Sequence, residues 1–387
     1  MARSTLPEDA EYVRTTPTFT DESVPSGLLR DHQVAAGNWA ELRVLSGTLG
    51  FEFADEGAVR SLARSDTQII DPSRLHRVVI EGPVAFELDF YRVNKARIGM
   101  LGINPDAFGV WHAKTPGITP WQDFLDGASQ IGYEAVELGP AGYLPSDPGE
   151  LAAALNARSL TLTCGYVAVA FHDPASRETM VEQLRQTAHT TAGAGAQFVL
   201  ALARPELTQG RVAPDRAAIH QIAEGLTMLS RVALEDHGLR LVFHPHVGMA
   251  VETEEETLAL LDATHGELAL CFDVGQFAYT GGDPAAFIQT HGDRVAYVHL
   301  RDLDPVVRDA CVAGEVDFEN AARRDVFCEP GAGSVDFEGV ANALISVGFD
   351  GPVIVERSYL DRTPDEARAA AERSFEVYSG LGFGKSG

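Results

Sequence analysis

After about residue 95, short apolar runs alternate along the chain with longer amphipathic segments. The apolar runs have the length of buried strands and lie at residues 97–104, 133–138, 160–166, 197–203, 239–246, 267–275, 294–302 and 351–358. Several of the segments between them begin at Pro, Asp or Thr and end at Gly, as helices do. Eight strand–helix units in succession predict an α/β fold, a closed (β/α)8 TIM barrel.

An open, doubly wound sheet is the alternative arrangement for the same units. Such a sheet normally carries a glycine-rich phosphate turn after its first strand. The segment GINPDAFG at residues 102–109 lacks that glycine pattern. We therefore favour the barrel and expect no nucleotide cofactor.

The preceding residues, 28–93, have a different pattern, in which strand-like runs meet at turn residues. WAELRVLSGTLGFEF holds two runs around Ser46-Gly47, and HRVVIEGPVAFELDFYRV holds two around Glu81-Gly82-Pro83. This pattern predicts a small all-β barrel or sandwich. We expect an all-β domain at residues 1–95 and the (β/α)8 barrel at residues 96–387.

Four of the apolar runs end in a residue type that binds metal ions. LVFH ends in His244, LCFD in Asp273, AYVH in His299 and VIVE in Glu356. Singly, such a histidine is more often a hydrogen-bonded core residue, and such a carboxylate more often caps a helix. On successive strands of a barrel, however, all four would meet at the C-terminal mouth, where barrel enzymes carry out their chemistry. The set predicts one divalent ion, Mn²⁺, Co²⁺, Fe²⁺ or Zn²⁺, and is too rich in nitrogen for Ca²⁺.

An ion of this kind polarises a carbonyl and stabilises the enediolate formed when the neighbouring carbon loses a proton. This chemistry suits a small keto-sugar or keto-polyol and requires a proton shuttle. His246, on the same strand face as His244, and Glu137, at the end of the second strand, are the candidate catalytic residues. His246 could instead be the ligand, with His244 as its support. We favour His244 as the ligand because it lies closer to the body of the strand.

Other polar and aromatic residues near strand ends are candidates for substrate binding. Asn104, Trp111 and Lys114 follow the first strand and could line the pocket. Arg301 and Asp302 could orient the metal ligands or bind substrate hydroxyls. A solvated lysine and a surface ion pair are the simpler alternatives.

Composition narrows the classes of function. The formal charge is −26, from 30 basic and 56 acidic residues, so neither nucleic acid nor an anionic membrane is expected as a partner. The sequence has no run of about 18 apolar residues and no signal-peptide core, which predicts a cytoplasmic protein. The cysteines have no CxxC spacing and fit reduced core thiols; they are Cys164, Cys271, Cys311 and Cys328.

The motifs HLRDLD, EPGAGSVDFEGV and FDGPVIVERS resemble those of the xylose-isomerase-like (AP endonuclease family 2) barrel superfamily, over about residues 97–360. IGMLGINP and HPHVGMAVETEEETLALLDAT resemble its inosose dehydratase group, whose substrate is 2-keto-myo-inositol (scyllo-inosose). The resemblance implies that His244, Asp273, His299 and Glu356 hold the metal. It also implies loss of water from a cyclic keto-polyol by β-elimination. VWHAKTPG and ERSYLDR depart from the group's pattern, so the substrate could differ.

Three other functions are weighed against dehydration. A metal-dependent isomerase or epimerase of the same superfamily would begin with the same enediolate. DNA repair requires three metals and is disfavoured by the charge of −26. A non-catalytic sensor would not need the four ligand-type residues. The sequence leaves open whether the chain forms a homo-oligomer.

Residues 12–93 resemble a small cupin-like domain of the kind associated with tellurite-resistance methyltransferases. A cupin gathers its metal from His and Glu on facing strands, and His32, Glu41 and His76 could bind a second metal here. The usual HxH motif is missing. A structural or dimerising role is the alternative.

Overall fold

The computed structural model describes residues 5–7, 10–34, 38–72, 74–93, 97–114, 117–171, 174–205, 212–357 and 362–384. The chain divides into two compact units between residues 96 and 97, apart from a few residues at the C-terminal end. Each unit has its own sheet. None of the helices in the described ranges is long and apolar enough to cross a bilayer.

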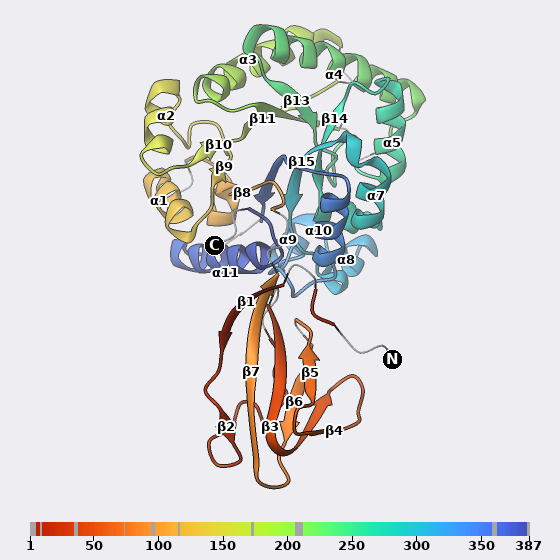
Figure 1. Cartoon of the computed structure of the whole chain (residues 1–387). Coiled ribbons are helices and arrows are strands. Elements are labelled where there is room, and N and C mark those ends of the chain that lie inside the picture. The colour runs from red at the N-terminus through yellow and green to blue at the C-terminus, as the bar shows by residue number, and fades with distance from the viewer. Residues whose placement is uncertain are drawn as a thin grey trace. The chain divides into compact units, whose positions relative to one another are not determined.

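The second unit is built on a ring of parallel strands surrounded by helices (Figure 1). The strands are β8 (Met100–Ile103), β9 (Ala135–Val136), β10 (Thr161–Leu162), β11 (Cys164–Val169), β12 (Phe198–Ala203), β13 (Arg240–Phe243), β14 (Ala269–Asp273), β15 (Val295–Leu300) and β16 (Pro352–Val355). β10 and β11 are one strand interrupted at Thr163, whose N–H donates to Val136 and whose carbonyl accepts from Phe198. These two bonds join β9 to β12 through the third strand, so the predicted eight-stranded barrel is confirmed.

The helices begin and end at the residue types that the sequence indicated. They are α1 (Trp121–Ile131), α2 (Pro148–Asn156), α3 (Arg177–Gly193), α4 (Arg216–His237), α5 (Glu254–Ala263), α6 (Val274–Tyr279), α7 (Pro284–His291), α8 (Pro305–Val312), α9 (Phe318–Arg323), α10 (Phe337–Ser346) and α11 (Pro364–Gly380), with short 3-10 turns η1 (Pro105–Phe108), η2 (Pro174–Ser176) and η3 (Gly292–Arg294). The Thr253 hydroxyl caps α5 and forms a capping box with Glu256. Gly238 ends α4 at φ 70°, a conformation that favours glycine.

The interior of the barrel is a layer of buried side chains directly below the mouth. Val242, Cys271, Tyr297 and Ile354 belong to this layer. Because alternate residues of a strand share a face, the residue two positions later on each strand points the same way, one layer higher. Those residues are His244, Asp273, His299 and Glu356. The packing of the apolar layer, at about 1.5–3 kcal/mol for each large side chain, therefore also aims the four polar side chains.

All four cysteines are free. Cys164 and Cys271 are buried in the barrel interior, as the sequence predicted for core thiols. Cys311 and Cys328 are partly buried.

The first unit is an antiparallel all-β fold, as predicted. Its strands are β1 (Ala10–Thr15), β2 (Phe19–Thr20), β3 (Asn38–Phe53), β4 (Arg60–Ala63), β5 (Thr67–Ile70), β6 (His76–Val79) and β7 (Val84–Val93). The first half of β3 pairs with β5 and β7, and its second half pairs with β4 and β6. At the change of partner, Gly47 has φ 76°, and a Cβ there would lie 2.1 Å from the Pro83 carbonyl oxygen.

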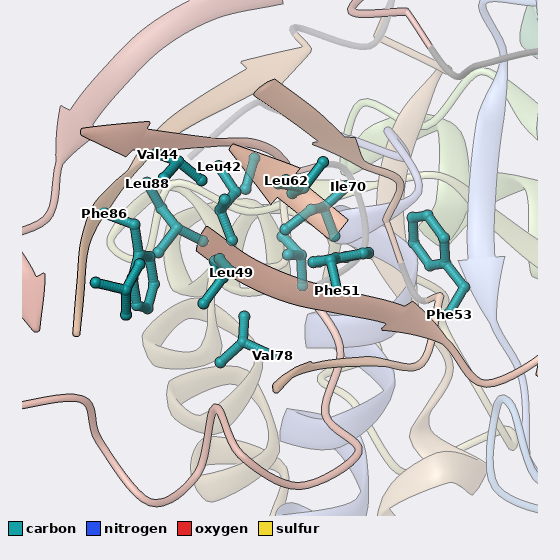
Figure 2. Close-up of a cluster of buried hydrophobic side chains, with 13 residues drawn as sticks. Leu42, Val44, Leu49, Phe51, Phe53, Leu62, Ile70, Val78, Phe86 and Leu88 are labelled. Carbon is teal, nitrogen blue, oxygen red and sulfur yellow. The ribbon is translucent and has the colours of Figure 1, made fainter. Parts of the chain in front are cut away.

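A cluster of buried apolar side chains holds this unit together (Figure 2). Leu42, Leu49 and Phe51 come from the two halves of β3 and are fully buried. Phe86 and Val78 come from the strands that pair with those halves. The long strand thus contributes to the core along its whole length, which explains why its apolar residues alternate with polar ones.

Candidate metal centre and active site

The structure brings the four strand-end residues together at the barrel mouth. One nitrogen or oxygen atom from each of His244, Asp273, His299 and Glu356 lies within 4.8 Å of the others. The first three side chains are only 2–3% exposed. Cys271 also lies within this distance of the two histidines. Burial raises the pKa of the Cys271 thiol to about 12.

The polar atoms of this group are close together without being hydrogen-bonded. Both ring nitrogens of His244, Oδ2 of Asp273, Nδ1 of His299 and Oε2 of Glu356 are buried and lack a hydrogen-bond partner among the described residues. His299 Nδ1 is 2.5 Å from Glu356 Oε2 and 3.9 Å from Asp273 Oδ2, at ion-pair distances but without hydrogen-bond geometry. Buried polar atoms rarely stay without a hydrogen bond, and here one ligand-type atom of each residue lies near those of the other three. The donor set fits a divalent cation.

Arg301 lies beside the two carboxylates of the group. Its Nε is 2.8 Å from Asp273 Oδ2, and its Nη2 is 2.6 Å from Glu356 Oε2. Burial disfavours the charged guanidinium, but Asp273 and Glu356 outweigh this effect and raise the pKa of Arg301. Arg301 therefore contacts two of the four ligand-type residues, and it is not among the described residues that line the mouth.

Asp302 is buried and holds a loop in place. Its Oδ2 accepts hydrogen bonds from the backbone N–H groups of Gly331 and Gly333, and its Oδ1 accepts from those of Leu303 and Val335. A Cβ at Gly333 would lie 2.4 Å from Asp302 Oδ1. The expectation that Asp302 binds substrate hydroxyls is wrong, because backbone donors occupy both of its oxygens.

Glu137 follows β9, and both of its carboxylate oxygens accept hydrogen bonds. Its Oε1 accepts hydrogen bonds from Tyr297 Oη at 2.7 Å and His299 Nε2 at 2.9 Å, and its Oε2 accepts from the Asn104 amide. Cys164 Sγ also donates to Oε1, at 3.3 Å. The contact at Nε2 of His299 leaves Nδ1 as the nitrogen that faces the other three ligand-type residues.

His246 lines the mouth but is not part of the four-residue group. Its ring lies 5.3 Å from that of His244, centroid to centroid. Nδ1 donates to the Val247 carbonyl at 2.7 Å, and Nε2 is 2.9 Å from the Gln276 amide nitrogen. Burial, with a further contribution from Arg301, lowers the pKa of His246 to about 4, so the ring is neutral.

The mouth encloses about 630 Å³ of space, including the part open to solvent. Trp111 and Tyr166 form aromatic walls and are 38% and 46% exposed. Asn104 also lines the mouth, whereas Lys114 is solvent-exposed and is not among the described lining residues. The expectation that Lys114 lines the pocket stays a prediction.

Sequence reasoning missed Asp106 and Tyr166. Asp106 lies in η1, lines the mouth, and its buried Oδ1 has no hydrogen-bond partner in the described part of the chain. Burial raises its pKa well above the usual range, and the nearby Glu356 adds to the shift. Its place directly after the first strand was the signal that could have revealed it.

The predicted second metal set in the first unit is not assembled. The rings of His32 and His76 are 4.2 Å apart. Glu41 instead lies opposite Asp89 and Ile69, and its carboxylate accepts a hydrogen bond from Tyr91, whereas His76 lies opposite Phe53. Every described group of three or more ligand-type residues lies in the barrel. The prediction failed because Glu41 occupies the opposite end of the long strand from the histidine pair.

Two loops that depart from the dehydratase pattern are only partly described. Residues 115–116 of VWHAKTPG and residues 358–361 of ERSYLDR lie outside the described residues.

The fold and site define a class of protein that the sequence comparisons identify. Residues 125–377 match the xylose isomerase-like TIM barrel family, and the chain belongs to it. Residues 14–88 match the TehB-like domain. The two units thus correspond to two different families.

Among curated proteins, an inosose dehydratase of Geobacillus kaustophilus is 29% identical over 278 residues, covering 68% of this chain and 88% of that protein. The rhizopine catabolism protein MocC of Rhizobium meliloti is 35% identical over 134 residues, covering 35% of this chain and 40% of that protein. The chain therefore spans most of the first relative but less than half of the second.

Solved structures share the barrel fold. The IolI protein with a bound zinc atom superposes with a TM-score of 0.58 at 18% identity, covering 73% of this chain and 98% of that one. A D-allulose 3-epimerase from Methylomonas sp. in complex with D-allulose gives 0.56 at 18% identity, covering 73% and 97%. The probable 3-DHS dehydratase AsbF of Bacillus anthracis gives 0.57 at 14% identity, covering 73% and 99%.

Proposed function

We propose that the protein is a metal-dependent hydro-lyase that removes water from a cyclic keto-polyol such as 2-keto-myo-inositol. The observation that carries the proposal is the group of buried atoms on His244, Asp273, His299 and Glu356 that lack a hydrogen bond within the described residues. The inosose dehydratase similarity over 68% of the chain supports the substrate class. We also propose residues 1–95 and 96–387 as separate domains, which the two compact units support.

The four residues would hold one divalent ion through two imidazoles and two carboxylates. This mixed set suits Mn²⁺, Co²⁺, Fe²⁺ or Zn²⁺. When bound, the ion polarises the substrate carbonyl and stabilises the enediolate left by proton loss. His244, and not His246, is the ligand in this proposal, because His244 has both ring nitrogens unpartnered among the described residues.

Two neighbouring residues would orient the ligands. Glu137 holds His299 by Nε2, and Arg301 lies against the carboxylates of Asp273 and Glu356. We therefore assign Glu137 a positioning role in place of the proton transfer expected from the sequence. Residues that hold ligands in this way commonly affect metal affinity by about 10- to 100-fold.

His246 is the base in this proposal. Its Nδ1–H is committed to the Val247 carbonyl, so the lone pair that can accept a proton is on Nε2. That nitrogen now meets the Gln276 amide, whose own oxygen is fixed by the Val247 N–H. A substrate C–H placed in line with the Nε2 lone pair, in the plane of the ring, would compete with this amide for Nε2. Asn104, Trp111 and Tyr166 would form the substrate walls.

A metal-dependent isomerase or epimerase is the second candidate, favoured by the fold shared with D-allulose 3-epimerase. Both reactions begin with proton loss next to a carbonyl. They differ in the product, because loss of water leaves a conjugated enone or diketone that absorbs in the near ultraviolet. Isomerisation and epimerisation leave no such chromophore.

Elemental analysis and an ultraviolet assay with scyllo-inosose test the proposal together. We expect one ion per wild-type chain, loss of that ion in His244→Ala and Asp273→Asn, and new absorbance with the wild type alone. Bound metal without absorbance would favour the isomerase or epimerase. Absence of metal from the wild-type barrel would contradict both candidates.

A further inference from the structure

The mouth contains a carboxyl group that neither the four-residue group nor its supports use. Asp106 lines the same space as His246, Glu356 and the aromatic walls. Its Oδ1 is buried and has no hydrogen-bond partner among the residues that the structure describes. It does not belong to the group that could hold the metal. A carboxyl group that lines a substrate-sized space and has an oxygen without a partner is available to a substrate.

The local fold holds Asp106 in this position. Asn104 caps η1 by accepting the Asp106 N–H at 3.0 Å, and its amide donates to Glu137. Gly109 ends the turn at φ 77°. Gly139 has φ 66° and packs directly on Pro105, because a Cβ there would lie 2.6 Å from the proline ring. The contact between Gly139 and Pro105 therefore joins η1 to the loop after β9. Asp106, the next residue in η1, lines the mouth.

Dehydration needs a proton donor for the departing oxygen, since hydroxide is a poor leaving group. Both oxygens of Glu137 accept hydrogen bonds, and Nδ1 of His246 donates to the backbone. Oδ1 of Asp106 has no such commitment within the described ranges. We propose that Asp106 is a further catalytic residue, the acid that protonates the hydroxyl expelled from the keto-polyol. This inference rests on the proposed function.

The proton and electron movements balance in this scheme. The carbon beside the carbonyl gives its proton to His246 Nε2, and the C–H electron pair becomes the new C=C bond. The β-carbon–oxygen bond breaks, and its electron pair leaves on the oxygen. That oxygen takes the proton of the Asp106 carboxyl group and departs as water. Solvent then removes the proton from His246 and returns one to Asp106, so the net change is loss of one water.

The leaving group distinguishes an acid from a structural residue. Fluoride departs as a stable anion and needs no proton, so a keto-polyol with fluorine in place of the β-hydroxyl bypasses the acid. For Asp106→Asn we expect dehydration of scyllo-inosose to fall by about 10²- to 10⁴-fold. Fluoride release from the fluoro analogue should stay within about threefold of wild type. Exchange of the substrate α-proton in D₂O, followed by NMR, should also persist because it needs only the base.

Further measurements separate this role from damage to the fold. Asp106→Asn should keep the wild-type metal content and melting temperature, because Oδ1 has no hydrogen bond to lose within the described part of the chain. Asp106→Ala should regain dehydration when acetate is added. Asp123→Asn, an exposed carboxylate on α1, is the matched control and should behave as wild type.

Three results would overturn the proposal. Dehydration by Asp106→Asn within threefold of wild type would show that no proton passes through Asp106. An equal loss of fluoride release and dehydration would make Asp106 a binding or structural residue. A wild type that binds metal but does not dehydrate the keto-polyol would overturn both the proposed function and the role of Asp106, whereas the first two results leave the proposed function intact.

Discussion

Replacing Glu137 by Gln tests how the barrel orients its metal ligands. The carboxylate accepts from Tyr297 and His299 on one oxygen and from Asn104 on the other. Glutamine has one accepting oxygen, so its NH₂ group must meet at least one of these donors. Either His299 loses its partner at Nε2, or Asn104 faces another amide donor. In the first case the rotation of the His299 ring is no longer restrained, and in the second the side chain that holds His299 loses its own contact with Asn104.

The expected effect is on metal affinity. Loss of a residue that orients a metal ligand weakens binding by about 10- to 100-fold. This corresponds to about 1.4–2.7 kcal/mol of binding free energy. The dissociation constant would be measured by competition with a fluorescent zinc indicator, on wild type and Glu137→Gln. Glu150→Gln, an exposed carboxylate on α2, is the control and should bind metal as wild type does.

The outcome also decides between two roles for Glu137. A variant that keeps the wild-type dissociation constant but loses turnover would refute the positioning role. It would instead support the proton-transfer role expected from the sequence. Tyr297→Phe provides a second check, since it removes one hydrogen bond to Glu137 but leaves His299 in contact. Its effect on metal affinity should be smaller than that of Glu137→Gln.

Three further predictions concern stability. Saturating metal should raise the melting temperature of the barrel and a chelator should reverse the rise, since a thousandfold excess over Kd adds about 4.1 kcal/mol; unchanged melting curves would contradict the site. Gly275→Ala should destabilise the barrel by about 1–3 kcal/mol in urea unfolding, because the new Cβ would lie 2.3 Å from Arg301 Cγ; wild-type stability would show that Arg301 is not tightly packed. Burial lowers the pKa of His76, and His32 adds to the shift. The unfolded state therefore takes up the proton first, so stability should fall as the pH drops below about 6.5. Urea unfolding of wild type and His76→Gln at pH 7.5 and 5.5 checks this, and an equal pH dependence in the two proteins would contradict it.

Much of the architecture could be predicted from the order of apolar and polar residues. Each apolar run of the barrel is a strand because its side chains alternate between the barrel interior and the helices, and both environments are apolar. The same two-residue period places His244 above Val242 and His299 above Tyr297. The sequence therefore predicted which side chains would meet at the mouth. Their roles as metal ligands stay a prediction that the metal analysis tests.

Only the tertiary structure decided what each of the other polar residues contacts. Glu137 is hydrogen-bonded to Tyr297, which lies 160 positions further along the chain, and no local pattern encodes such a contact. Asp302 turned inward because the loop at Gly331 and Gly333 supplies backbone donors to it. Glu41 lies near the start of β3, whereas His76 pairs with Phe53 at the end of that strand, so the strand register separates the two residues. The two-residue period of a strand determines the face on which a side chain lies. The contacts of that side chain depend on which distant segments the fold brings to the same face.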